Sequence, residues 1–171
     1  MSKKENGLLV FIPFLKKIGI LLGLLFIYRL VLFFFNFNLF QGVTFFDFAV
    51  GTWFDAITLS LLLFPFIVLY FIPTPEKWQS WKHSINSILF VTTSLFILAF
   101  NAWDIAYYSY TFKRISYDYL LFMLNSTETN ALAGTFLLEF WWLIVLFLLS
   151  SIVLIWAERK VKSESLSVKK I

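Results

Sequence analysis

Long runs of apolar residues, separated by short polar segments, dominate the chain. Four of these runs approach the length of about 20 residues that a helix needs to cross about 30 Å of hydrocarbon. Within each run the apolar residues cover every side of a helix, which is typical of helices that face lipid or lie inside a bundle. Pro65 is expected to kink the second run. We predict a bundle of four transmembrane helices, at residues 18–35, 56–72, 85–103 and 140–157.

Composition indicates that lipid is the main solvent. Of 171 residues, 60% are hydrophobic and only 14% are charged, whereas a soluble domain carries about 25% charged residues. A water-soluble fold of this length could not bury so much apolar surface in one core. The first run is too long for a cleaved signal peptide, and no small-residue cleavage site follows it. We therefore expect an all-α membrane protein.

Basic residues are distributed unevenly around the apolar runs. Eleven of the fourteen Lys and Arg residues lie in residues 1–17, in the connector 73–84 or in the tail 158–171. Four spans place these three segments on one side of the membrane, and the positive-inside rule makes that side cytoplasmic. Both termini are thus predicted to be cytoplasmic. Because the charges flank apolar runs and do not gather on one face, nucleic acid is not expected as a partner.

A longer segment, residues 104–136, joins the third and fourth spans on the outer side and mixes aromatic with charged residues. Its part from Tyr117 to Leu124 is predicted to form a short helix that lies in the membrane interface. Lys113 and Arg114 are candidates for binding phosphate. Lys113 would act as a point charge, and Arg114 would donate two parallel N–H groups from its planar guanidinium. The alternative is an ordinary pair of interfacial anchors.

Charged residues inside or beside the spans are candidates for function, because a charge in lipid is costly unless it is paired or reaches the interface. Arg29 lies about eleven residues into the first span and hence in its outer half. We expect Arg29 to pair with Asp55 or Asp104. The group either stabilises the bundle by holding its helices together or lines a cavity for a lipid headgroup that enters from the outer leaflet. Its predicted members are Arg29, Asp55, Asn101, Asp104, Tyr107 and Glu139.

Residue patterns for catalysis or metal binding are missing from the sequence. It contains no Cys, and its single His, His83, has no partner at ligand spacing. It also lacks a Ser/His/Asp arrangement, a zinc-protease motif, a phosphate-binding loop and an acidic metal cluster. We expect no catalytic residue, metal ligand or cofactor in this chain, and no activity of the chain alone toward phosphate or sulfate esters.

Several short motifs follow one another between the first span and the outer segment. They are, in order, Arg29-Leu30, Phe34-Phe35-Asn36, Phe40-Gln-Gly-Val-Thr44, Gly51-Thr-Trp-Phe-Asp55, Asn101-x-x-Asp104-x-x-Tyr107-Tyr108 and Thr111-Phe-Lys-Arg114-x-Ser-x-Asp118. In this order and spacing, the chain resembles the N-terminal membrane domain of the lipoteichoic acid synthase-like proteins. These are membrane-anchored phosphoglycerol transferases and sulfatases of the alkaline phosphatase superfamily.

The resemblance implies a larger protein. Members of this family carry five spans and then a large extracytoplasmic α/β domain, which holds a Thr or Ser-type nucleophile and a divalent metal. This chain departs from the pattern by ending after the fourth span, in the basic segment that would precede the fifth. We therefore expect a fragment that lacks its catalytic domain, so that no catalytic residue of the family can be carried over.

The resemblance predicts a membrane anchor in a bacterial cell (inner) membrane. The anchor would orient the missing catalytic domain and help to position a lipid substrate, with the bilayer, an anionic phospholipid and that domain as partners. The alternative is a complete small four-span protein that acts as a partner subunit or assembly factor. A transporter half fits less well, because no span is broken by paired Gly and Pro residues and no acidic residue lies at the midplane.

Overall fold

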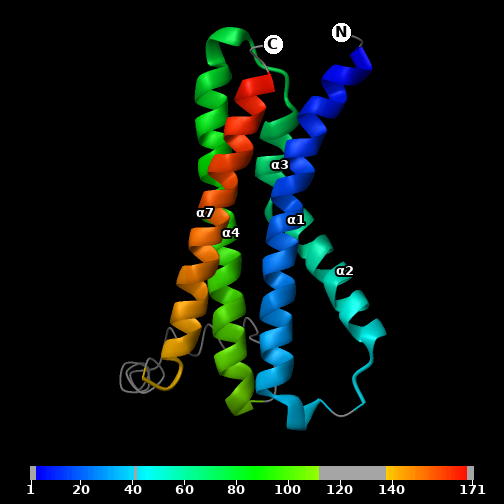
Figure 1. Ribbon diagram of the computed structural model, residues 1–171, viewed down its shortest axis with the longest axis vertical. Helices are drawn as coiled ribbons and strands as arrows, with labels where there is room; N and C mark the ends of the chain where they lie inside the picture. Colours follow the sequence, from blue (N-terminus) through cyan, green and yellow to red (C-terminus); the bar gives the residue numbers. More distant parts are fainter. Residues whose placement is uncertain (1–2, 41, 112–137, 169–171) are drawn as a thin grey trace.

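The computed structural model describes residues 3–40, 42–111 and 138–168 of the chain. Within these residues all regular structure is helical and there is no strand, which confirms the predicted all-α class. The labels are those of Figure 1. The elements are α1 (Lys3–Phe35), the short 3₁₀ helix η1 (Phe37–Leu39), α2 (Phe45–Leu62), α3 (Phe64–Phe71), α4 (Glu76–Thr111) and α7 (Trp141–Val168).

Four helices are long and apolar enough to cross a bilayer, as the sequence predicts. The qualifying segments are Phe11–Phe35, Phe45–Leu62, Lys77–Ser109 and Trp141–Val161. The chain is therefore a multi-pass membrane protein with four candidate spans. The predicted interfacial helix, from Tyr117 to Leu124, lies outside the described residues.

The helices extend well beyond the predicted spans. α1 contains 33 residues and is about 50 Å long at 1.5 Å per residue, which exceeds the hydrocarbon thickness of about 30 Å. α4 contains 36 residues and α7 contains 28. Most of the basic N-terminal segment and of the tail are thus continuations of spanning helices.

The second predicted span, residues 56–72, differs most from the structure. α2 begins at Phe45, where the carboxylate of Asp47 accepts hydrogen bonds from the backbone N–H and the hydroxyl of Thr44, at 2.7 and 2.8 Å. These bonds satisfy a donor at the helix start that would otherwise lack a partner. α2 ends at Leu62, and Pro65 lies in the first turn of α3. Because Pro has no N–H and suits a helix start, the expected kink is a break between two helices.

Three long helices, α1, α4 and α7, pack against one another and form the centre of the bundle (Figure 1). α3 packs on α4, and α2 packs mainly on α1. α2 has the least buried span, at 11%, against 28 to 33% for the other three. Its lower part diverges from α1 in Figure 1. The central packing includes the fully buried side chains of Leu21, Tyr28, Leu98, Ile105 and Leu154.

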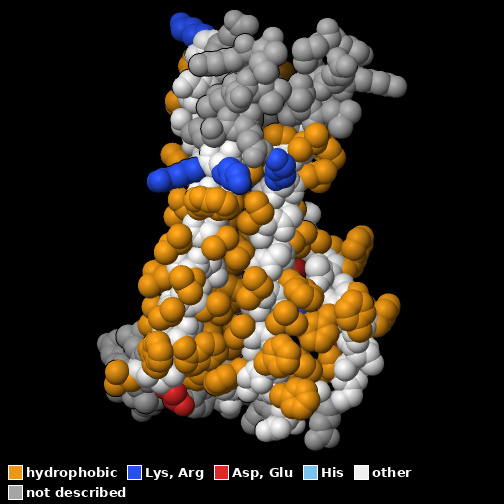
Figure 2. All heavy atoms as spheres, viewed as in Figure 1, with side chains coloured by type: hydrophobic (Ala, Val, Ile, Leu, Met, Phe, Trp, Pro, Cys, Tyr) orange, Lys and Arg blue, Asp and Glu red, His pale blue; other side chains and the backbone are white. Residues whose placement is uncertain are grey.

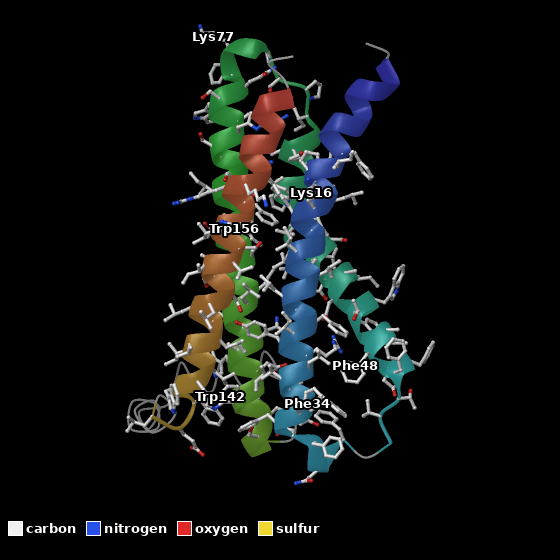
Figure 3. The ribbon with its side chains drawn as sticks, viewed as in Figure 1. Lys16, Phe34, Phe48, Lys77, Trp142 and Trp156 are labelled. Carbon is white, nitrogen blue, oxygen red and sulfur yellow. The ribbon has the colours of Figure 1, made fainter. Side chains whose placement is uncertain are left out.

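The two ends of the bundle contain different segments of the chain. The N- and C-termini and the connector 72–75 lie at one end, here called the terminal end, whereas η1 and the connector 36–44 lie at the far end (Figure 1). Lys16 and Lys77 lie toward the terminal end, and Phe34, Phe48 and Trp142 lie toward the far end (Figure 3). An even number of spans produces this arrangement, with both termini on one side.

The surface between the two ends is apolar. Figure 2 shows hydrophobic side chains over most of this face, with a row of Lys and Arg side chains crossing it at one level toward the terminal end. Large side chains such as Phe45, Trp53 and Leu61 are more than two-thirds exposed. Exposing so much apolar surface to water would be unfavourable in free energy. In a bilayer, lipid would cover this surface.

Reporter fusions should distinguish the two sides of the membrane. Because basic segments stay in the cytoplasm, fusions after Lys82 and after Lys162 are expected to be active as cytoplasmic reporters. A fusion near Thr129 is expected to be active as an outer-side reporter. A cytoplasmic signal from the fusion near Thr129 would rule out the four-span topology.

Candidate functional site

Arg29 of α1 is anchored to α2 by its guanidinium group. Its Nη2 atom donates one hydrogen bond to Oδ2 of Asp55, at 2.7 Å, and another to the backbone carbonyl of Gly51, at 2.9 Å. The Arg29 and Asp55 side chains are 21% and 19% exposed. Each charge therefore has a counter-charge at the contact between the two helices, which lowers the cost of placing either one in a span.

Gly51 leaves the space that the guanidinium occupies. A Cβ atom at this position would overlap with Nη1 and Cζ of Arg29. Gly51 and Asp55 are four residues apart and thus lie on the same face of α2. This gives the Gly-x-x-x-Asp spacing a physical reason: the glycine admits the arginine and accepts a hydrogen bond, and the acid balances its charge.

α4 brings two further predicted residues to the same place. Asn101 and Asp104 line a small cavity together with Arg29 and Asp55. We call Arg29, Gly51, Asp55, Asn101 and Asp104 the far-end cluster. The amide of Asn101 donates to the carbonyl of Ile97 in its own helix, at 2.9 Å.

The cavity inside the far-end cluster is too small for a lipid phosphate. Its volume is about 10 Å³, which is close to the lower limit for one water molecule. The cluster in this form joins α1, α2 and α4 and contains no ready-made headgroup site.

The remaining predicted residues lie apart from this cavity or outside the described chain. Tyr107 is buried on α4 and Glu139 is exposed just before α7, and neither lines the cavity. Lys113 and Arg114 lie outside the described residues.

A larger hollow also borders Arg29. It has a volume of about 170 Å³ and lies between α1, the start of α2 and the connector that joins them. Its apolar lining includes three aromatic rings, and Arg29 and Asp47 contribute the charged atoms. The apolar residues are Leu32, Phe33, Phe40, Val43 and Phe48. This hollow combines an aromatic lining with one cation and one anion.

A second polar group lies toward the terminal end. Nζ of Lys17 on α1 is 2.7 Å from Oε1 of Glu158 on α7, and the two side chains are 9% and 4% exposed. The hydroxyl of Ser87 on α4 donates to the same oxygen, at 2.8 Å. We call these three residues the terminal-end cluster, and it joins the three central helices.

Aromatic rings surround the cation of the terminal-end cluster. Nζ of Lys17 lies 5.8 Å from the ring centroid of Phe66 and 5.6 Å from that of Phe90. The second oxygen of Glu158, Oε2, is buried and has no hydrogen-bond partner among the described residues. The ion pair is thus held in an apolar environment, where each charge depends strongly on the other.

Sequence reasoning missed this pair. It assigned Lys17 to the basic N-terminal flank and Glu158 to the start of the tail, because both adjoin apolar runs. A signal was present, since Glu158 is an acid directly before the basic residues Arg159 and Lys160. To predict that Glu158 pairs with Lys17 and not with Lys16, one must know how α1 is rotated relative to α7.

Neither cluster contains a group of side chains that could hold a metal ion. Within residues 3–40, 42–111 and 138–168, no three His, Cys, Asp or Glu side chains lie close enough together to hold a metal ion. The divalent metal that the resemblance implies therefore has no fitting site in the described part of the chain. What both clusters do is cross-link helices through paired charges.

Comparisons with protein-family models, with curated proteins and with solved structures find no match. The helix lengths, the apolar surface and the charges paired between helices characterise the chain as a multi-span membrane protein.

Proposed function

We propose that this chain is the membrane domain of a lipoteichoic acid synthase-like protein and that it anchors a catalytic domain on the outer side of a bacterial cell membrane. One observation carries the proposal. Residues from three of the motifs behind the resemblance, Arg29, the Gly51–Asp55 segment and the Asn101–Asp104 segment, lie on three helices and meet in the far-end cluster. The Gly51–Asp55 and Asn101–Asp104 segments are more than 45 positions apart in the sequence, yet residues of both line the cavity beside Arg29.

The far-end cluster supports an anchoring role because it joins the helices near the end that the proposed topology places on the outer side. Arg29 and Asp55 tie α1 to α2, and α4 closes the cavity beside them. A rigid outer end would hold an attached domain at a defined height above the bilayer. The metal chemistry that the family performs would belong to that domain, so no reaction step is assigned to this chain.

The lipid substrate would approach through the hollow of about 170 Å³ beside Arg29. Its aromatic wall suits the glycerol and acyl portions of a lipid. Arg29 lines this hollow, and a guanidinium can bind phosphate through N–H groups other than those on Nη2, which donate to Asp55 and Gly51. The cavity inside the cluster would stay closed, and Asp55 would hold Arg29 in place.

A chimera tests the anchoring role. This chain would be joined to the fifth span and catalytic domain of a lipoteichoic acid synthase and expressed in a bacterium depleted of its own synthase. We expect the chimera to restore the glycerol phosphate polymer, measured by gel and immunoblot. The chain without the catalytic domain is expected to make none.

Two matched chimeras serve as controls. An unrelated four-span protein in place of this chain is expected to insert but to make little polymer. The Gly51→Ala chimera is expected to lose polymer because the added Cβ displaces Arg29. If the intact chimera reaches the membrane in equal amount and makes no more polymer than the unrelated anchor, the proposal is wrong.

A further inference from the structure

A groove of about 430 Å³ lies between α1 and α7, toward the terminal end. Its lining comes from one face of each helix, including Lys16, Gly19, Trp156 and Lys160. Figure 3 shows Lys16 and Trp156 at similar heights on neighbouring helices. The groove is distinct from both clusters, and its volume lies in the range of about 300 to 1,000 Å³ that is usual for ligand sites.

Helix geometry explains how the groove forms. Lys16 and Gly19 are three residues apart on α1, and Trp156 and Lys160 are four apart on α7, so each pair shares one helix face. Gly19 has no side chain, and no atom lies within 4 Å of where its Cβ would be. The missing side chain leaves open space between two helices that otherwise pack closely.

The charges in the groove are of one sign. Its described lining contains the two lysines and no acidic residue. Nζ of Lys160 lies 5.0 Å from the ring centroid of Trp156, which places one ammonium group over the indole. The nearby acid, Glu158, points into the bundle and pairs with Lys17. Each ammonium group has three N–H donors, so a lysine that already has a partner can still donate to an anion. The groove therefore offers donors for an anion from both helices.

The position of the groove in the membrane identifies the kind of anion. A row of Lys and Arg side chains crosses the surface toward the terminal end, and an apolar surface continues from it toward the far end (Figure 2). On α7 this surface includes the exposed side chains of Leu149, Ile152 and Val153. An occupant with an anionic head and long apolar chains would match both parts. Basic pockets between spanning helices are known to hold such headgroups.

We propose that the groove between α1 and α7 binds the headgroup of an anionic phospholipid in the leaflet at the terminal end. The phosphate lies between Lys16 and Lys160, Trp156 marks the headgroup level, and the acyl chains run along α7 toward the bilayer centre. Gly19 provides the room for the head. This site lies at the opposite end from the hollow beside Arg29 and does not depend on the proposed function.

Native mass spectrometry of the full chain in detergent tests the proposal. The protein is titrated with dioleoylphosphatidylglycerol or with dioleoylphosphatidylcholine, which share acyl chains but differ in headgroup charge. Two lysines near a surface contribute about 1 kcal/mol each, so we expect tighter binding of phosphatidylglycerol by roughly tenfold or more. Excess inorganic phosphate is expected not to displace the lipid, because it has no acyl chains.

Three variants locate the site. Gly19→Leu fills the groove without a change in charge, and Lys16→Gln with Lys160→Gln removes the charge without filling it. Both are expected to abolish the preference for phosphatidylglycerol. Gly23→Leu is the matched control, because Gly23 lies one turn further along α1, also has open space at its Cβ position and does not line the groove. This variant is expected to keep the preference.

Several outcomes would overturn the proposal. Equal affinity of the unaltered protein for the two lipids would show that the groove does not select an anion. A preference that survives both the Gly19→Leu and the double lysine substitutions would place the lipid elsewhere. Dimers that form without lipid and disappear in Gly19→Leu would identify a second copy as the occupant.

Discussion

Replacing Lys17 with Met is expected to destabilise the bundle more than any other single change considered for this chain. The substitution leaves the carboxylate of Glu158, which is 4% exposed, with Ser87 as its described partner. Removing one partner of a buried ion pair costs about 3 to 5 kcal/mol, because the remaining charge is no longer compensated. The measurement is the free energy of unfolding of the full chain in detergent, followed by circular dichroism.

The neighbouring lysine provides the control for this prediction. Lys16 is exposed, whereas Lys17 is buried. Lys16→Met removes the same charge one position earlier and is expected to change stability by about 1 kcal/mol or less, because the interactions of an exposed lysine contribute little. Adding Glu158→Gln to Lys17→Met is expected to recover much of the loss, because the remaining charge is then removed. Equal effects of the two lysine substitutions would contradict a buried pair.

Replacing Gly51 with Ala is expected to disrupt the far-end cluster. The new Cβ would overlap with the guanidinium of Arg29, so this side chain must move away. It would then lose its hydrogen bonds to Asp55 and to the carbonyl of Gly51. Charged hydrogen bonds contribute about 1.5 to 3 kcal/mol, and a loss of this size is expected in the same unfolding measurement.

A second glycine in a spanning helix separates this effect from a general effect of alanine. Gly23→Ala adds a Cβ where no atom lies within 4 Å. It is expected to be neutral or to stabilise α1 by about 0.5 to 1 kcal/mol, because alanine favours the helix. If Gly51→Ala behaved in the same way, Gly51 would not be making room for Arg29.

A double-mutant cycle measures the coupling between Arg29 and Asp55. Arg29→Leu alone is expected to lower the melting temperature, because it leaves Asp55 without its counter-charge. Adding Asp55→Asn is expected to recover part of the loss, since removing both members of a pair costs less than removing one. Simply additive effects would show that the residues do not interact.

The far-end cluster illustrates what a sequence can predict about charges in a membrane. If each apolar run is treated as a helix with a rise of about 1.5 Å per residue, Arg29 and Asp55 lie at matching depths in the membrane. The structure pairs these two residues. Depth depends on position along the chain alone, so it can be read without a structure. The choice of Asp55 over Asp104 depends on how α2 and α4 are rotated around α1, and depth carries no information about rotation.

The second predicted span shows a different limit. The sequence predicts its start at residue 56, just after Asp55, but α2 begins at Phe45, where Asp47 caps it from within the first turn. The helix start is therefore set by a local capping contact that lies before the predicted span. The sequence predicts a disruption at Pro65, but whether it bends a helix or separates two depends on the packing of α3 against α4.

The sequence by itself determined that the chain is a multi-span membrane protein and how many candidate spans it has, because both depend on the length and hydropathy of the apolar runs. The tertiary structure alone decided that Lys17 faces Glu158 inside the bundle while Lys16 lines the outer groove. Adjacent residues on a helix differ by about 100° in direction. The rotation of α1 against α7 therefore decides whether a lysine is a buried partner or a surface charge.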